Sequence, residues 1–455
     1  MSNYITDWLS SVPVFYNTKN NNISYDINDV IDYKNIELDP DGLINYLDFG
    51  YSVFGQTPIK NVKFLEPNCE ITIKNKSLCI KKLKDPVEEY IDKEYSVDCT
   101  LNTIKTKINN WENNSKGKII IPTSGGYDSR LLNLMISSKD RIRAYSYGVS
   151  ENQSNSSEVI IAQQIARQMG IKWKHIELGN YHKYLSEWIN IYGCSVHAHG
   201  MYQMEFYKKI IENGDGQSNL LSGIIGDAWA GSVVIDEIKK YEDVDFLSYS
   251  HGLKADSSAL LIKGNENVLK RNYYIENKNK LENKRWRVVE SMRRKIILLR
   301  YLIEVPKKLG FKPWSPFLDI EVAMKMLCLP DEKRIKRNWE TEYFKRNSIF
   351  YRNTLNMDRS NVLNVIANKK NPLEKLDEKI LSKYFNKNYI FWINKQIERF
   401  HKRNTVEYIN DCFLKNYYIN GIINKVGLSG YYKNELEGYY AYLVVKPIEN
   451  ILKIR

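Results

Sequence analysis

The sequence lacks both a disulfide framework and an apolar run long enough to cross a bilayer. Its six cysteines are scattered, without any C-x-x-C pair: Cys69, Cys79, Cys99, Cys194, Cys328 and Cys412. In a chain of this length such spacing favours free thiols in a reducing compartment. The most apolar stretches, Asn219–Ile235 and Ile296–Val305, each contain a charged residue and fall short of the ~20 residues that span a membrane. The N-terminus also lacks the basic and apolar regions of a signal peptide, so we expect a cytoplasmic protein without a transmembrane segment.

The composition excludes a disordered or fibrous chain. Of the 455 residues, 43% are hydrophobic and 27% are charged, as in folded globular proteins. Lysine and arginine exceed aspartate and glutamate by 67 to 54, which gives a formal net charge of +13. This surplus favours anionic partners such as nucleotides, but it does not determine the fold.

Two regions of different character follow one another along the chain. Residues 1–95 contain short apolar runs broken by proline and asparagine. Strands are expected there at Tyr51–Phe54, Val62–Leu65 and Glu70–Ile73. We therefore predict a small β-rich N-terminal domain, and a second domain over residues 96–455.

Strand-like and helical segments alternate after residue 117. Strands are expected at Lys118–Pro122, Ile142–Val149 and Trp173–Leu178, with helical segments at Arg130–Ser137 and Ser156–Met169 between them. This alternation predicts an α/β domain with a parallel, doubly wound sheet. A helical C-terminal extension, dense in lysine, arginine, tyrosine and asparagine, begins at about residue 331.

The segment Ser124-Gly-Gly-Tyr-Asp-Ser129 stands directly between a predicted strand and a predicted helix. Gly125 and Gly126 allow the backbone to approach an anion, and the helix N-terminus supplies unpaired N–H groups. Ser124 and Ser129 can add hydroxyl donors. Asp128 would repel a phosphate unless a cation lay between them, which suits Mg²⁺. The alternative is an ordinary glycine turn with Asp128 as a helix cap.

This segment resembles the PP-loop of ATP pyrophosphatases and has no lysine of the Walker A type. The resemblance implies an adenine nucleotide alpha hydrolase-like fold. It also implies that the loop holds the β,γ-pyrophosphate of ATP and leaves the α-phosphorus open to attack.

A second segment, Ser222-Gly-Ile-Ile-Gly-Asp-Ala-Trp-Ala-Gly231, narrows the family. It is similar to the S-G-x-G-x-D-E segment of asparagine synthetases and β-lactam synthetases, although its second glycine, Gly226, falls one place late. The resemblance implies that Ser222 and Gly223 contact ATP. It also implies that Asp227 is the second magnesium ligand, beside Asp128.

Other residues fit the same family. Tyr147 stands where the family's adenine contact falls, and Asp319 ends a segment that resembles R-x-P-F-L-D. Lys369 or Lys370 stands where the family has a lysine that stabilises charge in the transition state. A core aromatic, a helix cap and a solvated basic face are the respective alternatives. The basic runs Arg293–Lys295, Lys333–Arg337 and Lys402-Arg403 are likewise interpreted as solvated helix faces. A docking surface for an anionic carrier, a sugar nucleotide or a membrane-linked intermediate is the alternative.

The N-terminal region departs from the glutamine-dependent members of this family. Those enzymes expose a cysteine nucleophile at the mature N-terminus, whereas here Ser2 follows Met1 and the first cysteine is Cys69. Without that thiolate there is no covalent route to ammonia from glutamine. We therefore expect a truncated, structural glutaminase-like domain. The nitrogen would come from ammonia, from an amine of the substrate, or from a glutaminase partner.

A second departure lies within the synthetase site. Ile224 and Ala228 replace residues that are polar or acidic in the family, so a general base must come from elsewhere. Asp319 is one candidate. His197 and His199 are others, because residues two apart share a face on an extended segment and these fall where the acceptor substrate is expected. Ordinary packing is the alternative for both histidines.

The resemblance implies a carbon–nitrogen ligase that uses ATP and Mg²⁺. A carboxylate of a small molecule, sugar or peptide would be adenylated and passed to an amine or ammonia, with release of AMP and pyrophosphate. Two alternatives are an asparagine synthetase that uses glutamine or ammonia, and a non-catalytic nucleotide-binding relative. A tRNA-modifying PP-loop enzyme would need cysteines near the site, so we expect no nucleic-acid partner. A homodimer is compatible with the sequence.

Overall fold

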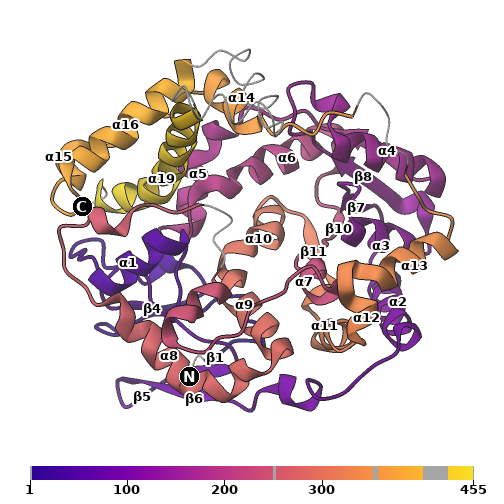
Figure 1. Cartoon of the computed structure of the whole chain (residues 1–455), viewed down its shortest axis with the longest axis horizontal. Helices are drawn as coiled ribbons and strands as arrows, with labels where there is room; N and C mark the ends of the chain where they lie inside the picture. The colour runs from indigo at the N-terminus through magenta and orange to yellow at the C-terminus, as the bar shows by residue number, and fades with distance from the viewer. Residues whose placement is uncertain (1–2, 249–252, 352–356, 403–428, 454–455) are drawn as a thin grey trace.

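The computed structural model describes residues 3–248, 253–351, 357–402 and 429–453. Its centre is a five-stranded, wholly parallel sheet in the order β11-β10-β7-β8-β9 (Figure 1). The strands are β7 (Ile119–Pro122), β8 (Ile142–Ser146), β9 (Lys172–His175), β10 (Asn219–Leu221) and β11 (Lys312–Trp314). The predicted α/β class with a parallel sheet is confirmed. The strands β10 and β11, at three residues each, are too short to give a sequence pattern of their own.

Helices cover the sheet and connect its strands. The helix α2 (Val97–Asn114) precedes β7, α3 (Tyr127–Met135) follows β7, and α4 (Ser157–Met169) follows β8. Parallel neighbours require such crossovers, and the all-buried Ile119–Ile121 run of β7 shows a strand covered on both faces. The helix α3 begins three residues before the predicted start because Gly126 is its N-cap. Because β7 and β10 are adjacent and parallel, the loops at their carboxyl ends meet.

Most of the rest of the chain is helical, as predicted for its C-terminal part. The longer helices are α1 (Pro40–Phe49), α5 (Leu185–Tyr192), α6 (Tyr202–Ile210), α8 (Glu266–Glu282), α9 (Lys284–Leu299), α10 (Tyr301–Lys308), α11 (Ile320–Leu327), α13 (Asn338–Arg346), α14 (Leu363–Lys370), α16 (Lys387–Lys402) and α19 (Ser429–Lys453). Three are single turns: α7 (Gly226–Ala230), α12 (Asp331–Arg334) and α15 (Glu378–Leu381). No helix within the described residues is long and apolar enough to cross a membrane.

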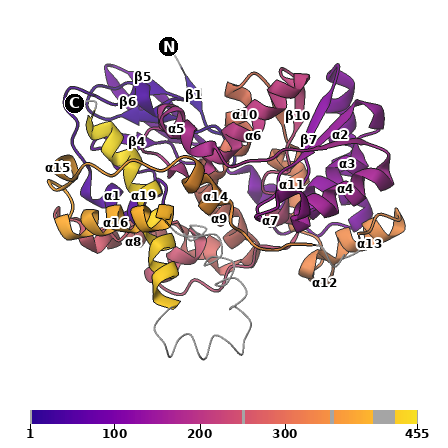
Figure 2. The ribbon, with the colours of Figure 1, turned by 90° about the horizontal axis from the view of Figure 1, so that it is seen from above.

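The N-terminal region holds two antiparallel three-stranded sheets, in agreement with its predicted β-rich character. One has the order β1-β5-β6 and the other β3-β2-β4. Their strands are β1 (Tyr4–Ile5), β2 (Phe15–Asn17), β3 (Ile23–Ser24), β4 (Val62–Phe64), β5 (Cys69–Lys74) and β6 (Ser77–Lys82). The strand predicted at Tyr51–Phe54 was wrong, because this segment forms only isolated bridges. Figures 1 and 2 place these sheets and the central sheet at opposite ends of the molecule, with α9 and α10 between them.

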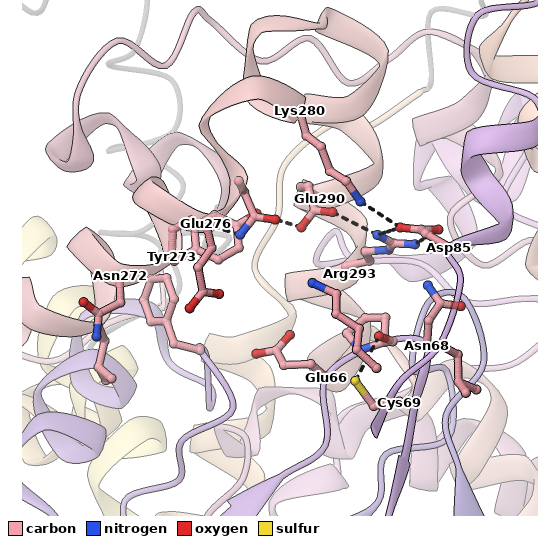
Figure 3. A pocket seen from close by; sticks show the side chains of 16 residues that line it. Glu66, Asn68, Cys69, Asp85, Asn272, Tyr273, Glu276, Lys280, Glu290 and Arg293 are labelled. Carbon is pink, nitrogen blue, oxygen red and sulfur yellow. Dashed lines mark hydrogen bonds and ion pairs between the residues drawn. The ribbon is translucent and has the colours of Figure 1, made fainter. Parts of the chain in front are cut away.

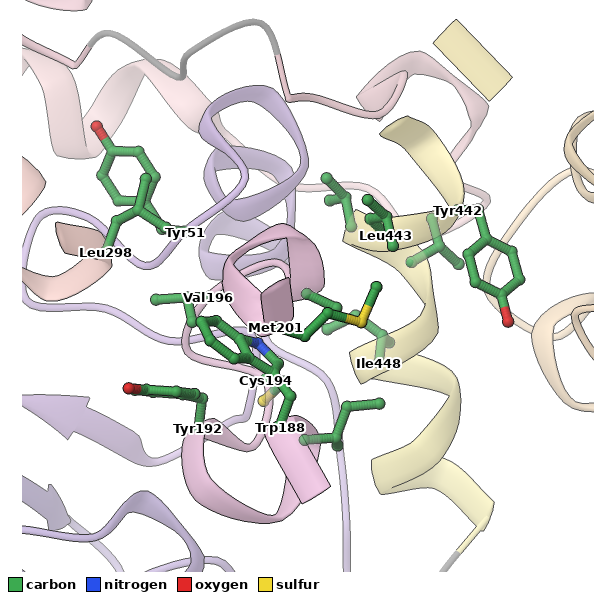
Figure 4. Close-up of a cluster of buried hydrophobic side chains, with 14 of the residues drawn as sticks. Tyr51, Trp188, Tyr192, Cys194, Val196, Met201, Leu298, Tyr442, Leu443 and Ile448 are labelled. Carbon is green, nitrogen blue, oxygen red and sulfur yellow. The ribbon is translucent and has the colours of Figure 1, made fainter. Parts of the chain in front are cut away.

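The largest hydrophobic core does not stop at the predicted domain boundary. It joins Tyr51 of the N-terminal region, Trp188 of α5 and Leu443 of α19, each at 0% exposure (Figure 4). The hydroxyl of Tyr46 in α1 also donates a buried hydrogen bond of 3.1 Å to the carbonyl of Val444. A second core lies around Trp229 on the side of the central sheet. The N-terminal region is therefore packed onto the C-terminal helix, while the division at residues 95 and 96 stays a prediction.

Candidate functional site

The loop after β7 is shaped by its two glycines. Gly125 has a φ of +73°, and a Cβ there would overlap the Ile161 side chain of α4. Gly126 caps α3 with no side-chain hydrogen bond to the first turn. The N–H groups of that turn are therefore directed to the space in front of the sheet, as an anion site requires.

Side chains around this loop hold it in place. The Arg130 guanidinium donates 2.9 Å to the buried carbonyl of Gly125 and lies over the rings of Tyr127 and Phe344. Ser129 is buried and its hydroxyl lies 3.4 Å from the carbonyl of Gly126. Ser124 is exposed, so its hydroxyl is accessible to a ligand. Arg130 was not singled out in the sequence.

The loop after β10 contains a strained residue. Ile225 has a φ of +53°, which a β-branched side chain rarely adopts. Backbone strain of this kind costs of order 1–3 kcal/mol and is concentrated at functional sites. Ser222 joins the loop to β11, since its N–H donates 2.8 Å to the carbonyl of Trp314.

The two glycine-rich loops bring Asp128 and Asp227 together. A Cβ built on Gly223 would lie 3.1 Å from Cβ of Asp128, and one built on Gly226 would lie 3.0 Å from its Cγ. The carboxyl group of Asp128 therefore lies directly against the loop that carries Asp227. Burial raises the pKa of Asp128 to about 7, against the charge of Arg337, and the negative charges of Glu340 and Asp227 add to the shift. The two aspartates are therefore close enough to interact electrostatically.

Arg337 is a site residue that the sequence did not indicate. Its guanidinium forms an ion pair with Asp128 and a second with Glu340, at 3.0 Å from Nη2 to Oε1. Glu340 is completely buried, and Arg337 lies 4.9 Å from the ring centroid of Tyr127. Both Lys336 and Arg337 have left-handed φ values, 52° and 58°, which turn the arginine toward the loop. The interpretation of Lys333–Arg337 as a solvated face was therefore wrong at Arg337.

Lys295 is a second cation that the sequence analysis did not place here. It is 5% exposed in α9, and burial lowers its pKa to about 8 although the charge of Asp227 opposes this shift. Arg294 is buried too, and the side chain of Arg293 is only 7% exposed, so the solvated face predicted for Arg293–Lys295 was wrong. The sequence does contain one indication that Lys295 is buried. It directly precedes four apolar residues, Ile296–Leu299, on the same helix, so its neighbours are buried too. Arg403 lies outside the described residues.

The residues at this site fit a magnesium ion that also binds phosphate. Asp128, Asp227 and Glu340 act on one another electrostatically, and Asp128 keeps a side-chain exposure of 22%. In the described part of the chain, no cluster of three or more histidine, cysteine or acidic side chains has the geometry to hold a metal alone. Magnesium is commonly bound by one or two carboxylates together with phosphate oxygens and water, which matches this donor set.

Tyr147 and the two histidines lie among the aromatic side chains around α6. The Tyr147 ring packs 5.7 Å from Tyr202 and 5.3 Å from Phe206, measured between ring centroids. His197 accepts a 3.2 Å hydrogen bond from the N–H of His199, and His199 packs against Tyr202. These contacts agree with the packing alternative, and the catalytic or adenine-binding roles stay predictions.

Asp319 and the two lysines have surroundings of their own. Asp319 caps α11 through the N–H groups of Glu321 and Val322, and forms a 2.9 Å ion pair with Lys107 of α2. Lys369 and Lys370 end α14, where Lys370 lies beside Gly179. The catalytic roles of these three side chains stay predictions.

Comparison with known proteins adds little to this geometry. No protein-family model matches the chain, and no curated protein matches it. Among solved structures, a chain of glutamine-dependent NAD+ synthetase from Acinetobacter baumannii, in complex with ADP, is 14% identical with a TM-score of 0.22. The match covers 67% of this chain and 54% of the synthetase chain. A similarity this low does not identify a site or a substrate.

Proposed function

We propose that the protein is an ATP- and Mg²⁺-dependent ligase that adenylates a carboxylate and transfers the acyl group to an amine or ammonia. The observation that carries this proposal is the contact between the loops after β7 and β10, which sets Asp128 against the backbone beside Asp227. Asp128 stands in the first turn of α3 and Asp227 in that of α7, and two such carboxylates near buried cations are suited to a polyphosphate and a divalent ion.

Some residues of this site would bind the anionic phosphates, and others would orient the groups that do so. The N–H groups of the first turn of α3 and the exposed Ser124 hydroxyl would bind phosphate oxygens. Lys295 supplies positive charge from the side of Asp227. Arg337 joins Asp128 to Glu340 and fixes the direction of the Asp128 carboxyl group. Magnesium held by the two aspartates would neutralise the charge of the phosphates.

The reaction needs two displacements. A carboxylate oxygen of the substrate attacks the α-phosphorus of ATP, and the bond between that phosphorus and the pyrophosphate oxygen breaks. The amine nitrogen then attacks the acyl carbon, the bond to the AMP oxygen breaks, and the nitrogen loses a proton. This chain contributes mainly orientation and electrostatic stabilisation, which are large terms in phosphoryl chemistry.

Exchange of labelled pyrophosphate into ATP tests the first displacement. The full chain is mixed with ATP, Mg²⁺, labelled pyrophosphate and a panel of amino acids, uronic acids and peptides. We expect exchange that depends on one class of acid, and a fall of about 100-fold in Asp128→Asn and Asp227→Asn. Asp140→Asn is the matched control, because Asp140 is exposed at a distance from both loops. Exchange that is unaffected by both site variants would contradict the proposal.

A non-catalytic nucleotide-binding protein is the second candidate. It is favoured by Ile224 and Ala228, which are buried apolar residues where related enzymes have polar or acidic ones. ATP binding without exchange for any acid of the panel would support this candidate instead of the ligase.

A further inference from the structure

A separate cavity of about 350 Å³ lies between the N-terminal region and the helices α8 and α9 (Figure 3). Its walls come from residues 54, 66–69 and 82–85 on one side and from residues 269–293 on the other. None of the residues predicted from the sequence to bind ATP or magnesium lines it. It is large enough for a small molecule of a few carbon atoms.

The floor of this cavity is a closed network of charges. Arg293 binds Asp85 through both terminal nitrogens at 2.8 Å and Glu290 at 3.0 Å. Lys280 adds a 3.1 Å ion pair to Asp85, and the Tyr273 hydroxyl donates 2.7 Å to Glu290. The side chains of Asp85, Glu290 and Arg293 are each at most 8% exposed. These groups satisfy one another, so the floor is already built without a ligand.

Two carboxylates in the walls of the cavity do not take part in this charge network. Glu66 and Glu276 form no hydrogen bond and no ion pair through their side chains with any residue that the structure describes, and Figure 3 shows both directed into the cavity. Over the whole lining, four carboxylates face the three cations Lys82, Lys280 and Arg293.

Asn68 offers a further polar group to the cavity, independent of the carboxylates. It is 7% exposed and lines the same cavity, yet its side-chain amide makes no hydrogen bond within the described structure. Its amide atoms are not sealed from solvent, so they are available to a ligand that enters the cavity. An amide oxygen can accept from the same donor that a carboxylate attracts.

The aromatic wall of the cavity is held by a cation. The Arg294 guanidinium lies 3.6 Å from the ring centroid of Tyr273 and 4.2 Å from that of Phe54. The two rings are 5.9 Å apart and form part of the lining. The guanidinium already lies on these ring faces, and the rings form the apolar part of the wall.

We propose that this cavity binds a small molecule with protonated primary amines, held by Glu66 and Glu276, with the Asn68 amide as a further acceptor. An anion would meet these two carboxylates, and a purely apolar molecule would leave them and Asn68 without partners. The site is separate from the proposed ligase reaction, so each can fail without the other.

Calorimetry on the full chain tests this site with three ligands of one length. Butane-1,4-diamine carries two positive charges, butane-1,4-diol none, and succinate two negative charges. We expect the diamine to bind at least ten times more tightly than the diol, with no binding of succinate. Equal affinities of diamine and diol, or tighter binding of succinate, would overturn the proposal.

Substitutions locate the binding. We expect the double variant Glu66→Gln, Glu276→Gln to bind the diamine at least ten times more weakly than the wild type. Because both residues are solvent-accessible, the variant protein should still fold. Glu94→Gln, a change of the same kind at an exposed position outside the cavity, is the control. Diamine affinity that is the same in the double variant and in the control would show binding elsewhere and refute this site. Pyrophosphate exchange, measured in parallel, reports on the ligase alone.

Discussion

Asp128 is the residue on which most of the site's charges act. Arg337 pairs with it, Glu340 and Asp227 repel it, and the backbone of Gly226 lies against its carboxyl group. The aspartates were predictable from the sequence because each stands within a local glycine-rich motif. Arg337 and Lys295 were not, because the burial of a charged side chain depends on packing between segments far apart in the chain.

Gly226→Ala tests how closely Asp128 is fitted at the residue scale. The added Cβ would lie 2.8 Å from the Phe317 ring and 3.0 Å from Cγ of Asp128, so one of them must move. We expect ATP affinity in the presence of Mg²⁺, measured by calorimetry, to fall by about tenfold or more. Gly216→Ala is the control, because its nearest contact of 3.3 Å is with the Ile211 side chain. Equal affinities of the two variants would show that the loop tolerates a side chain at Gly226.

At the scale of elements, the C-terminal helix α19 packs its apolar face against the core and also forms hydrogen bonds with the rest of the molecule. His182 lies between α14 and α19, with Nδ1 2.9 Å from the carbonyl of Asn371 and Nε2 2.8 Å from the Tyr439 hydroxyl. Because the carbonyl only accepts, Nδ1 carries the proton and Nε2 accepts from tyrosine. The strands β7 to β9 and the helices between them were predictable from periodicity. The position of α19 was not predictable, because the segments it packs against are hundreds of residues away in the sequence.

His182 gives the protein a defined loss of stability in acid. Burial lowers its pKa from 6.5 to about 4, so the unfolded chain takes up a proton between these values while the folded chain does not. The free energy of unfolding therefore falls as the pH drops from 6.5 to 4, by at most about 3 kcal/mol from this group. Urea unfolding of His182→Gln is expected to show a smaller decrease over that interval. An unchanged pH dependence would mean that His182 is protonated in the fold.

The bond between α1 and α19 can be measured in the same way. Tyr46→Phe removes the buried hydrogen bond to Val444 and keeps the ring, so we expect a loss of about 1 kcal/mol. Tyr25→Phe, at a side chain that is 49% exposed, is expected to change stability little. Equal effects of the two substitutions would indicate that the hydrogen bond does not form.

At the scale of the whole molecule, the N-terminal region and α19 share one core. Phe15, Tyr51 and Val444 are all at 0% exposure within it. The β-rich character of residues 1–95 was predictable from local patterns, but this shared core was not, because composition does not show which surfaces meet. We expect near-ultraviolet and far-ultraviolet circular dichroism to report one coincident thermal transition. Two separate transitions would favour independent domains divided near residue 95.

The central claim is that Asp128 and Asp227 act on the same bound ATP through one magnesium-linked contact. Mg²⁺-dependent ATP affinity, measured for the wild type, Asp128→Asn, Asp227→Asn and the double variant, tests it most directly. We predict that each single substitution weakens ATP binding. The loss of binding free energy in the double variant should be smaller than the sum of the two single losses, by a coupling energy of at least about 1 kcal/mol. Losses that simply add, or single variants that bind ATP like the wild type, would contradict the shared site.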